Sequence, residues 1–319
     1  MKPDEAAGAQ AAPHEVEVAG PLARVLAGQP GLGARLGAFE RAAASDAPLL
    51  IVGEPGSGRS TLARALHAAS GRAGGPLVEV DPGSLPTTLF ESELFGYRRG
   101  AFTGAEVSRS GRVERATGGT LLLDHVEELP LASQAKLLRL VAEKVYAPLG
   151  GREEQADVRF LAVGSEDLPR RVASGAFRED LYYRLEVLAF RVPPLRERPE
   201  DLPGLIDHLL ADLAERFGRP DLALAPGARD WMIRHPWPGN ARQVRNTLER
   251  ALVLASGKAP LDPEPPAGAE ERPRPLDEVE AQEIRRALAY TRGHQTEAAR
   301  LLGISRKALW AKRKRHGIP

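Results

Sequence analysis

The stretch from Leu49 to Thr61, with the sequence LLIVGEPGSGRST, decides how the middle of this chain folds. Its apolar start predicts a β-strand, and the residues that follow the turn, as far as Ala69, predict a helix. The turn between them supplies the residues expected to bind a nucleotide: Gly53, Glu54, Pro55, Gly56, Ser57, Gly58, Arg59, Ser60 and Thr61. Glycines let backbone N–H groups wrap a phosphate, and the helix dipole favours an anion at this end. The order is that of a P-loop, with an ordinary strand-to-helix turn as the alternative.

One residue of this loop departs from the usual P-loop pattern. Arg59 stands at the position where such loops carry a lysine. Lysine is a compact point charge beside the terminal phosphates, whereas arginine is planar and longer. The exchange is therefore not conservative at a site that must hold phosphate.

Short apolar runs separated by helical stretches predict a parallel sheet covered by helices on both faces, which is an α/β fold. The runs are 48–53, 77–80, 120–124 and 158–163. The third run ends on Asp124, and ligands of open α/β sheets bind at the carboxyl ends of the strands. We therefore expect Ser60 and Asp124 to hold Mg²⁺, in the case of Asp124 usually through water. A helix N-cap is the alternative role for Asp124.

Prolines and local composition divide the chain into five parts. Residues 1–20 predict a flexible leader, 21–193 the α/β nucleotide-binding subdomain, 194–256 a helical subdomain, 257–275 a proline-rich linker, and 276–319 a small helical domain. A leader of this length is too short for a regulatory domain, so we expect no N-terminal regulatory domain. Input control would then come from elsewhere, or the protein would be constitutive.

The composition is that of a folded protein. The chain is 42% hydrophobic and 27% charged, and it has no cysteine, which excludes disulfides and cysteine-ligated metal sites. No apolar run approaches the roughly 20 residues that a membrane-spanning helix needs. The first 20 residues also lack the basic and then apolar pattern of a signal peptide. We therefore expect a cytoplasmic protein with no membrane partner.

The last part of the chain predicts a helix-turn-helix, in which two short helices are joined by a turn containing glycine. Helices are expected over 277–291, 295–302 and 306–316. Gly303 would end the second helix and Ser305 would cap the third. Three apolar residues would share one face of the second helix: Ala298, Leu301 and Leu302.

The third helix of this domain would enter the major groove of DNA. Residues 305–319 contain six Lys or Arg and no acid, so phosphate neutralisation and a steep salt dependence are expected. The residues predicted to contact DNA are Arg306, Lys307, Trp310, Lys312, Arg313 and Lys314. The first two lie near the helix start and are the candidates for base edges, whereas the later ones suit phosphates. A solvated basic face that binds no DNA is the alternative.

Several strings of the sequence together resemble one protein family. They are ESELFGY at 91–97, GAFTGA at 100–105, FREDLYYRL at 177–185, PPLRER at 193–198 and WPGN at 237–240. In this order they resemble the bacterial enhancer-binding proteins, the AAA+ activators of sigma-54 RNA polymerase. The string from Gln295 to Ser305 is similar to the Fis-type helix-turn-helix that ends such activators.

The resemblance implies an AAA+ ATPase with a helical lid, whose dimers assemble into a hexameric-type ring. It also implies a loop that touches sigma-54 and remodels the closed promoter complex. That loop consists of Gly100, Ala101, Phe102, Thr103, Gly104 and Ala105. Its glycines suit a mobile tip on which Phe102 and Thr103 are the bulky contacts. A plain surface hairpin is the alternative.

Three arginines take roles from the same resemblance. Arg178 and Arg184 would reach the γ-phosphate of a neighbouring subunit, where such arginines stabilise charge during phosphoryl transfer. Arg242 would be the sensor arginine of the lid and would read the nucleotide of its own subunit. Without the family, Arg178 and Arg184 are equally candidates for weak surface ion pairs with Glu179 or Asp180.

Four positions depart from the catalytic pattern of the family: Arg59 for lysine, Asp81 for asparagine, His125 for glutamate and Gly164-Ser165 for Thr-Asn. The family's glutamate polarises the attacking water, and its asparagine switches that glutamate. A neutral imidazole can accept a proton, but Mg²⁺ nearby would disfavour the imidazolium that results. Glu127 and Glu128 are close in sequence, but a shift of two or three residues would change their direction off the strand end. The hypothesis is that hydrolysis is slow or absent, with a drifted but working site as the alternative.

Two functions from different classes follow. The leading interpretation is a sequence-specific DNA-binding transcription regulator that binds ATP with Mg²⁺, recognises an upstream inverted repeat as a dimer, and remodels sigma-54 RNA polymerase. The alternative is a degenerate, non-hydrolysing AAA+ regulator that serves as a scaffold, partner or antagonist of an active relative. A replication initiator or helicase loader would not be expected to carry the GAFTGA loop and this tail.

Overall fold

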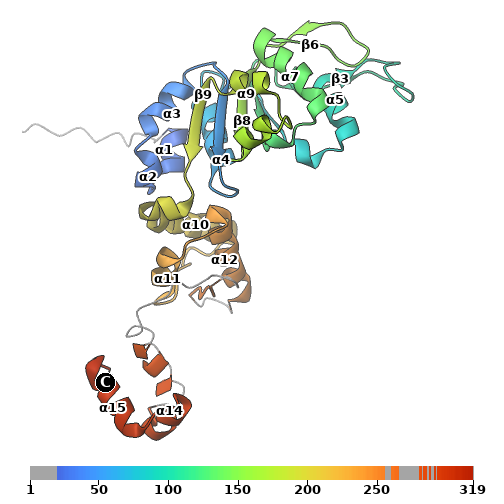
Figure 1. Ribbon diagram of the computed structural model, residues 1–319. Helices are drawn as coiled ribbons and strands as arrows, with labels where there is room; N and C mark the ends of the chain where they lie inside the picture. Colours follow the sequence, from blue (N-terminus) through green and yellow to red (C-terminus); the bar gives the residue numbers. More distant parts are fainter. Residues whose placement is uncertain are drawn as a thin grey trace, which may run out of the picture. The chain divides into compact units, whose positions relative to one another are not determined.

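The computed structural model describes residues 20–255, 260–265, 280–281, 283–285, 287–288, 291 and 293–318. The chain divides into two compact units, Met1–Glu264 and Pro265–Pro319 (Figure 1). Nearly all of the leader and most of the linker expected from the sequence lie outside the described residues. Within the described ranges, no helix is both long and apolar enough to cross a membrane.

A five-stranded parallel sheet with the order β2-β5-β8-β1-β9 forms the centre of the first unit (Figure 1). Its strands are β1 (Leu49–Gly53), β2 (Leu77–Val80), β5 (Thr120–Leu123), β8 (Arg159–Gly164) and β9 (Leu188–Val192). The four apolar runs predicted as strands are all present. The edge strand β9 escaped prediction because its partly buried residues alternate with exposed ones, so it forms no continuous apolar run.

Helices cover both faces of this sheet, as the apolar strands require. On one face Leu49 and Ile51 of β1 pack with Phe39 and Leu62, and on the other face Leu50 joins a second core cluster. The helices of the first face include α1 (Pro21–Leu26), α3 (Leu36–Ala43) and α4 (Arg59–Ala68). The helices of the second face include α5 (Thr87–Phe95), α7 (Leu131–Glu143) and α9 (Glu179–Leu185). The shorter helices are α2 (Pro30–Gly33), α6 (Arg112–Arg115) and α8 (Leu168–Ala173).

Two small hairpins project from the α/β part. The first pairs β3 (Gly96–Tyr97) with β4 (Arg109–Ser110), and the second pairs β6 (Val145–Tyr146) with β7 (Glu154–Gln155). Tyr97 bridges to Leu149 of the second hairpin. The loop 98–108 of the first hairpin contains the six residues from Gly100 to Ala105.

Three helices follow the sheet and complete the first unit. They are α10 (Leu202–Arg216), α11 (Ala228–Arg234) and α12 (Asn240–Leu254). They surround the fully buried Trp237, whose indole Nε1 donates a hydrogen bond of 2.7 Å to the carbonyl of Met232. This is the helical subdomain that the sequence predicts after the α/β part.

The second unit is a helix-turn-helix. Helix α14 (Gln295–Leu301) ends at Gly303, whose φ of 67° is left-handed, and α15 (Arg306–Arg315) starts at Ser305. The Ser305 hydroxyl accepts a hydrogen bond of 3.1 Å from the N–H of Ala308, so the predicted cap is present. One prediction for α14 is wrong: Ala298 is buried, but Leu301 is half exposed and Ala299 takes its place in the core.

Candidate nucleotide site and DNA interface

The P-loop joins β1 to α4 in the form that the sequence predicts. Gly56 and Gly58 have φ angles of 76° and 105°, which side-chain-bearing residues rarely adopt. Gly56 is also crowded, because a Cβ there would lie 2.5 Å from the carbonyl oxygen of Gly239 and 2.9 Å from Cβ of Arg242. The loop is therefore wrapped closely by the start of α12 in the lid.

The two predicted magnesium ligands lie together at the carboxyl end of the sheet. Ser60 Oγ donates a 2.8 Å hydrogen bond to Asp124 Oδ2, and Asp124 Oδ1 accepts one of 3.0 Å from the N–H of His125. A hydroxyl and a carboxylate are oxygen ligands of the kind that Mg²⁺ prefers, and it usually adds water and phosphate oxygens. Two protein oxygens leave most of an octahedral shell open, so Ser60 and Asp124 fit an Mg²⁺ ion whose remaining ligands are phosphate oxygens and water.

Arg59 points inward rather than into solvent. It is 5% exposed, and its Nη1 donates a short hydrogen bond to the carbonyl of Gly164 at the end of β8. Burial lowers the pKa of Arg59 below its ordinary value, and the carboxylates of Glu127 and Asp124 oppose that shift. The residue that replaces the P-loop lysine thus reaches from the start of α4 to the end of β8.

His125 faces two carboxylates. Its Nδ1 lies 3.4 Å from Asp81 Oδ2 and 3.9 Å from Asp124 Oδ1. Two of the positions that depart from the family pattern, 81 and 125, therefore contact each other. The backbone of His125 is left-handed, with a φ of 53°, and it starts the 3₁₀ turn Val126–Glu128.

This turn gives the two following glutamates opposite directions, which the sequence did not reveal. Glu128 is exposed, and its Oε2 lies over Gly83. Glu127 is buried, and its Oε2 lies 3.3 Å from the position that a Cβ on Gly164 would take. The shift of two or three residues was expected to change the direction of both side chains off the strand end, and in the structure Glu127 lies against the end of β8.

Hydrogen bonds between side chains of the lid and the P-loop fix the start of α12. The buried Asn240 donates 3.2 Å bonds to Glu54 Oε2 and to the carbonyl of Pro55, and it accepts one of 2.8 Å from the N–H of Leu195. Arg196 forms a two-pronged ion pair with Glu54, which lowers the pKa of that carboxyl. The string WPGN contains Asn240, but nothing in the sequence indicates this contact.

A buried ion pair ties three segments together beneath the P-loop. Arg198 and Asp201 are almost fully buried and lie 3.1 Å apart. Arg198 donates a 2.7 Å bond to the carbonyl of Ser57, and Asp201 accepts a 2.6 Å bond from the N–H of Gly31. This ion pair thus connects three segments: the N-terminal helices, the P-loop and the residues that precede α10. It was not predicted from the sequence.

The three arginines predicted from the family lie in different surroundings. Arg242 is exposed and adjoins Gly56. Arg178 is exposed and pairs with Asp180 at 2.8 Å, so the ion pair considered as its alternative role is present. Arg184 is exposed on α9 and donates a 3.1 Å bond to the carbonyl of Ala142.

The GAFTGA loop is folded yet presents its large side chains outward. Gly100 N–H donates to the carbonyl of Ala105 at 2.8 Å, and the ring of Tyr97 packs edge-on against Phe102 at 5.0 Å between centroids. Ala105 is buried, whereas Phe102 and Thr103 are exposed. An ion pair between Arg98 and Glu154 anchors the loop to the β6–β7 hairpin.

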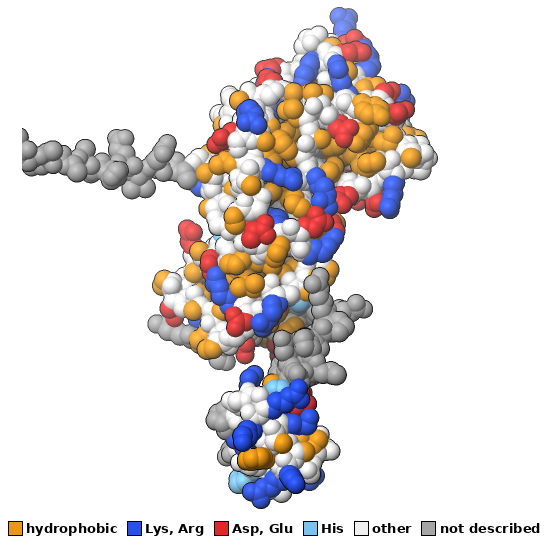
Figure 2. Space-filling view, turned by 60° about the vertical axis from the view of Figure 1, so that its left-hand side comes forward, with side chains coloured by type: hydrophobic (Ala, Val, Ile, Leu, Met, Phe, Trp, Pro, Cys, Tyr) orange, Lys and Arg blue, Asp and Glu red, His pale blue; other side chains and the backbone are white. Residues whose placement is uncertain are grey.

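The predicted DNA contacts divide between two sides of α15. Arg306, Lys307, Trp310 and Lys314 are exposed, and Lys314 Nζ lies 5.5 Å from the Trp310 ring centre. Lys312 instead pairs with Glu280 at 2.6 Å, and Arg313 is partly buried. Lys and Arg side chains are prominent on the visible face of this unit (Figure 2). The exposed set is available for DNA in this structure, whereas Lys312 forms an ion pair within the domain.

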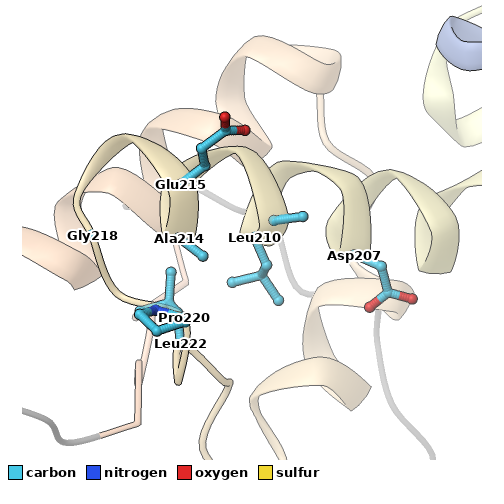
Figure 3. A pocket seen from close by; sticks show the side chains of 8 residues that line it. Asp207, Leu210, Ala214, Glu215, Gly218, Pro220 and Leu222 are labelled. Carbon is cyan, nitrogen blue, oxygen red and sulfur yellow. The ribbon is translucent and has the colours of Figure 1, made fainter.

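A hollow of about 650 Å³ lies away from the P-loop, on the lid (Figure 3). It is lined mainly by apolar residues near the end of α10, among them Leu210, Ala214 and Leu222. Its acidic residues are Asp207 and Glu215, and Asp207 is already paired with Arg229 at 2.5 Å. The hollow therefore offers no cluster of groups for catalysis or phosphate binding.

Three sequence families match consecutive parts of the chain. The sigma-54 interaction domain matches residues 26–191, the AAA+ ATPase lid domain 196–264, and the bacterial regulatory protein Fis family 275–316. The first match alone covers more than half of the chain. The chain belongs to the sigma-54 enhancer-binding proteins. The predicted family and the predicted fold class, an AAA+ module with a lid and a helix-turn-helix domain, are confirmed.

Named relatives of this sigma-54 enhancer-binding protein are longer than the chain. The transcriptional regulatory protein ZraR of Salmonella typhimurium is 44% identical over 280 residues, which are 85% of this chain and 64% of ZraR. The alginate biosynthesis transcriptional regulatory protein AlgB of Pseudomonas aeruginosa is 43% identical and matches 91% of this chain and 66% of its own. A crystal structure of NtrX from Brucella abortus in complex with ATP has a TM-score of 0.66 at 33% identity, over 90% of this chain and 67% of NtrX. The chain spans about two thirds of the length of these relatives.

Proposed function

We propose that this chain is an ATP-dependent activator of sigma-54 RNA polymerase that acts from upstream DNA sites. The carrying observation is that one compact unit holds both the P-loop and the exposed loop with Phe102 and Thr103. A nucleotide-driven change at the P-loop can then move a contact surface in the same body. A cytoplasmic location, where DNA and polymerase meet, is part of the proposal.

ATP and Mg²⁺ are the proposed ligands of the P-loop. Gly56 and Gly58 give the loop its phosphate-binding shape, Ser60 and Asp124 supply metal-binding oxygens, and Arg242 adjoins the loop from the lid. The structure of NtrX in complex with ATP supports the choice of nucleotide. Mg²⁺ would neutralise phosphate charge, while Arg59 and Arg242 add positive charge from the protein.

The chain is proposed to work as a ring built from dimers. Arg178 and Arg184 are exposed on and beside α9 rather than buried in their own subunit, which suits arginines that act on a neighbour. The helix-turn-helix would hold a dimer on an inverted repeat, with the exposed face of α15 in the major groove. DNA binding would raise the local concentration of subunits and favour the ring.

Reconstituted transcription tests this function. Sigma-54 polymerase, a template with upstream inverted repeats and the purified chain should give open complexes with ATP but not with a non-hydrolysable analogue. Phe102→Ala should abolish open complexes while leaving ATP binding and DNA binding unchanged, because the ring is exposed and touches only Tyr97 among its aromatic neighbours. Leu131→Ala, a substitution of another exposed apolar residue of the same unit, is the control and should remain active.

A second candidate function is a non-hydrolysing scaffold of the same fold. Arg59 donates a hydrogen bond to the carbonyl of Gly164, and His125 contacts Asp81. Neither side chain is therefore unengaged and available to bind phosphate or to orient water. Open complexes that form equally well with the non-hydrolysable analogue, or none at all despite ATP and DNA binding, would favour this candidate. The single assay therefore separates the two functions.

A further inference from the structure

A buried carboxylate at the nucleotide site lacks a hydrogen-bond partner at one of its oxygens. Glu127 is 8% exposed, and its Oε2 accepts no hydrogen bond in the described structure. Removing a carboxylate from water without giving it a partner is costly, so such groups are rare in folded proteins. A buried polar group without a partner in a native structure calls for an explanation, and a catalytic role or an ordered water is among the recognised ones.

The surroundings place this oxygen beside the phosphate site. It lies 3.3 Å from where a Cβ on Gly164 would be, and the carbonyl of Gly164 holds the Arg59 guanidinium. Among the carboxylates whose charge raises the pKa of Arg59 against the effect of burial, Glu127 contributes most, ahead of Asp124. Oε2 nevertheless accepts no hydrogen bond from that guanidinium, so its acceptor capacity is left unused in the described structure.

The other carboxylates of the site already have partners. Asp124 accepts from Ser60 and from its neighbouring N–H, Asp81 faces His125, and Glu166 pairs with Arg191 at 2.9 Å. Of these carboxylates, Glu127 alone has a buried oxygen without a hydrogen-bond partner in the described structure.

We propose that Glu127 is the catalytic carboxylate of ATP hydrolysis in this chain and replaces the glutamate missing at His125. The proposal rests on the proposed function, since it needs ATP at the P-loop. In the step, the water oxygen forms a bond to the γ-phosphorus and Glu127 Oε2 takes a proton from that water. The bond from the γ-phosphorus to the β–γ bridging oxygen breaks, and its electron pair leaves with ADP. The products are ADP and inorganic phosphate, and Arg59 stabilises charge on the transferred group.

The proposal links the departures from the family pattern to one another. A side chain at Gly164 would press on Val126 Cγ1 at 3.0 Å and on Glu127 Oε2 at 3.3 Å, so a glycine at the end of β8 makes room for this glutamate. His125 supplies the left-handed turn that brings Glu127 back toward the sheet. The substitutions thus accompany a relocated carboxylate rather than a simple loss.

The test compares Glu127→Gln with Glu128→Gln in the full chain. Both remove one carboxylate from the same turn, but Glu128 is exposed and faces Gly83. ATP hydrolysis, the affinities for ATP and ADP, and the melting temperature are measured for each protein. We expect Glu127→Gln to lose about 100-fold or more in kcat, the usual size of a general-base effect, while ATP affinity stays within about 3-fold. Glu128→Gln should hydrolyse ATP as the unchanged chain does.

A third variant, Glu127→Asp, separates catalysis from simple charge balance. It keeps a buried negative charge beside Arg59 but withdraws the carboxylate by one methylene. A catalytic role predicts a large loss of kcat, whereas a counter-ion role predicts normal kcat in both Glu127 variants with altered ATP affinity or melting temperature. That second pattern would overturn the inference and leave the proposed function intact. A chain that binds ATP but never turns it over would defeat the hydrolytic function itself, and this inference with it.

Discussion

At the scale of single residues, two histidines with lowered pKa values make the stability of the first unit depend on pH. His67 is buried with Nδ1 at 2.9 Å from Thr120 Oγ1, and burial holds its pKa below the ordinary value of 6.5. The pKa of His235 is lowered by burial as well. In both cases the unfolded chain binds the proton more readily than the folded one, so the stabilisation is complete above pH 6.5 and is lost as the pH falls below it.

We therefore expect a lower melting temperature at pH 5.5 than at pH 7.5, by about 2–4 °C for each kcal/mol lost. The carboxylates with lowered pKa values, such as Glu54 and Asp207, lose their contribution only at more acidic pH and do not disturb this window. Scanning calorimetry gives the measurement. His67→Asn, which keeps a polar atom near Nδ1 but cannot be protonated in this range, should flatten the dependence. Equal melting temperatures at the two pH values would contradict the prediction.

Some residues of the nucleotide site could be predicted from the sequence, and others could not. Asp124 and Ser60 were predictable because strand ends and P-loops put them at one sheet edge. Glu127 was not, because its direction depends on one left-handed φ at His125, an angle that residues with side chains seldom adopt. The long Arg59 side chain was predicted as unusual, but its bond to Gly164 depends on the neighbouring strand order.

At the scale of elements, the start of α12 couples the lid to the P-loop through one side chain. Asn240→Ala removes two hydrogen bonds to the loop and leaves the buried N–H of Leu195 without its acceptor. It also places alanine at a φ of 53°. We expect a loss of about 1–3 kcal/mol in stability from the orphaned group, and weaker ATP binding because the loop loses its support.

Denaturant unfolding and nucleotide titration measure the two effects. Asn246→Ala is the matched control, because this asparagine is exposed on the same helix, and it should change neither quantity by much. Asn240→Gly relieves the backbone strain but not the lost bonds, so it should recover only part of the stability. Full stability in Asn240→Ala would show that the bonds to Glu54 and Pro55 contribute nothing.

Elements with continuous apolar sequence were predictable, and those defined by partners were not. The strands β1, β5 and β8 are almost entirely buried, β2 is partly buried, and all four follow from short runs rich in apolar residues. Strand β9 and the two-residue strands of the hairpins depend on what they pair with, since their own residues are partly exposed. In the second unit, the cap at Ser305 and the stop at Gly303 were predictable because both are local.

At the scale of the whole molecule, each active site of the proposed ring is formed by residues of two neighbouring subunits. Glu127→Gln and Arg184→Ala should each abolish hydrolysis alone, the first at its own site and the second at the site of a neighbour. When the two variants are mixed, a subunit with Arg184→Ala keeps its Glu127 and receives Arg184 from a Glu127→Gln neighbour. Activity should return to about a quarter of the unchanged chain at equal amounts, as random mixing at a head-to-tail interface predicts.

Steady-state ATPase across mixing ratios measures this effect. The control is a mixture of two separate preparations of the Arg184→Ala variant, which should stay inactive. If Arg184 serves its own subunit, or serves only its hydrogen bond to Ala142, the mixture will be no more active than its components.

The left-handed turn at His125 also bears on how inactive members of the family are recognised. An enzyme is commonly classed as inactive when one catalytic residue is missing from its sequence, in this family the glutamate after the strand aspartate. In this chain the residue at that position is left-handed and starts a 3₁₀ turn, and the side chain of Glu127 in that turn lies against the end of β8. If Glu127 is the catalytic carboxylate, as proposed, a catalytic group can stand at a later position of the chain and still act at the same end of the sheet. Relatives with a histidine at this position are better sorted by the acid in the following turn and the glycine ending β8 than by the missing glutamate.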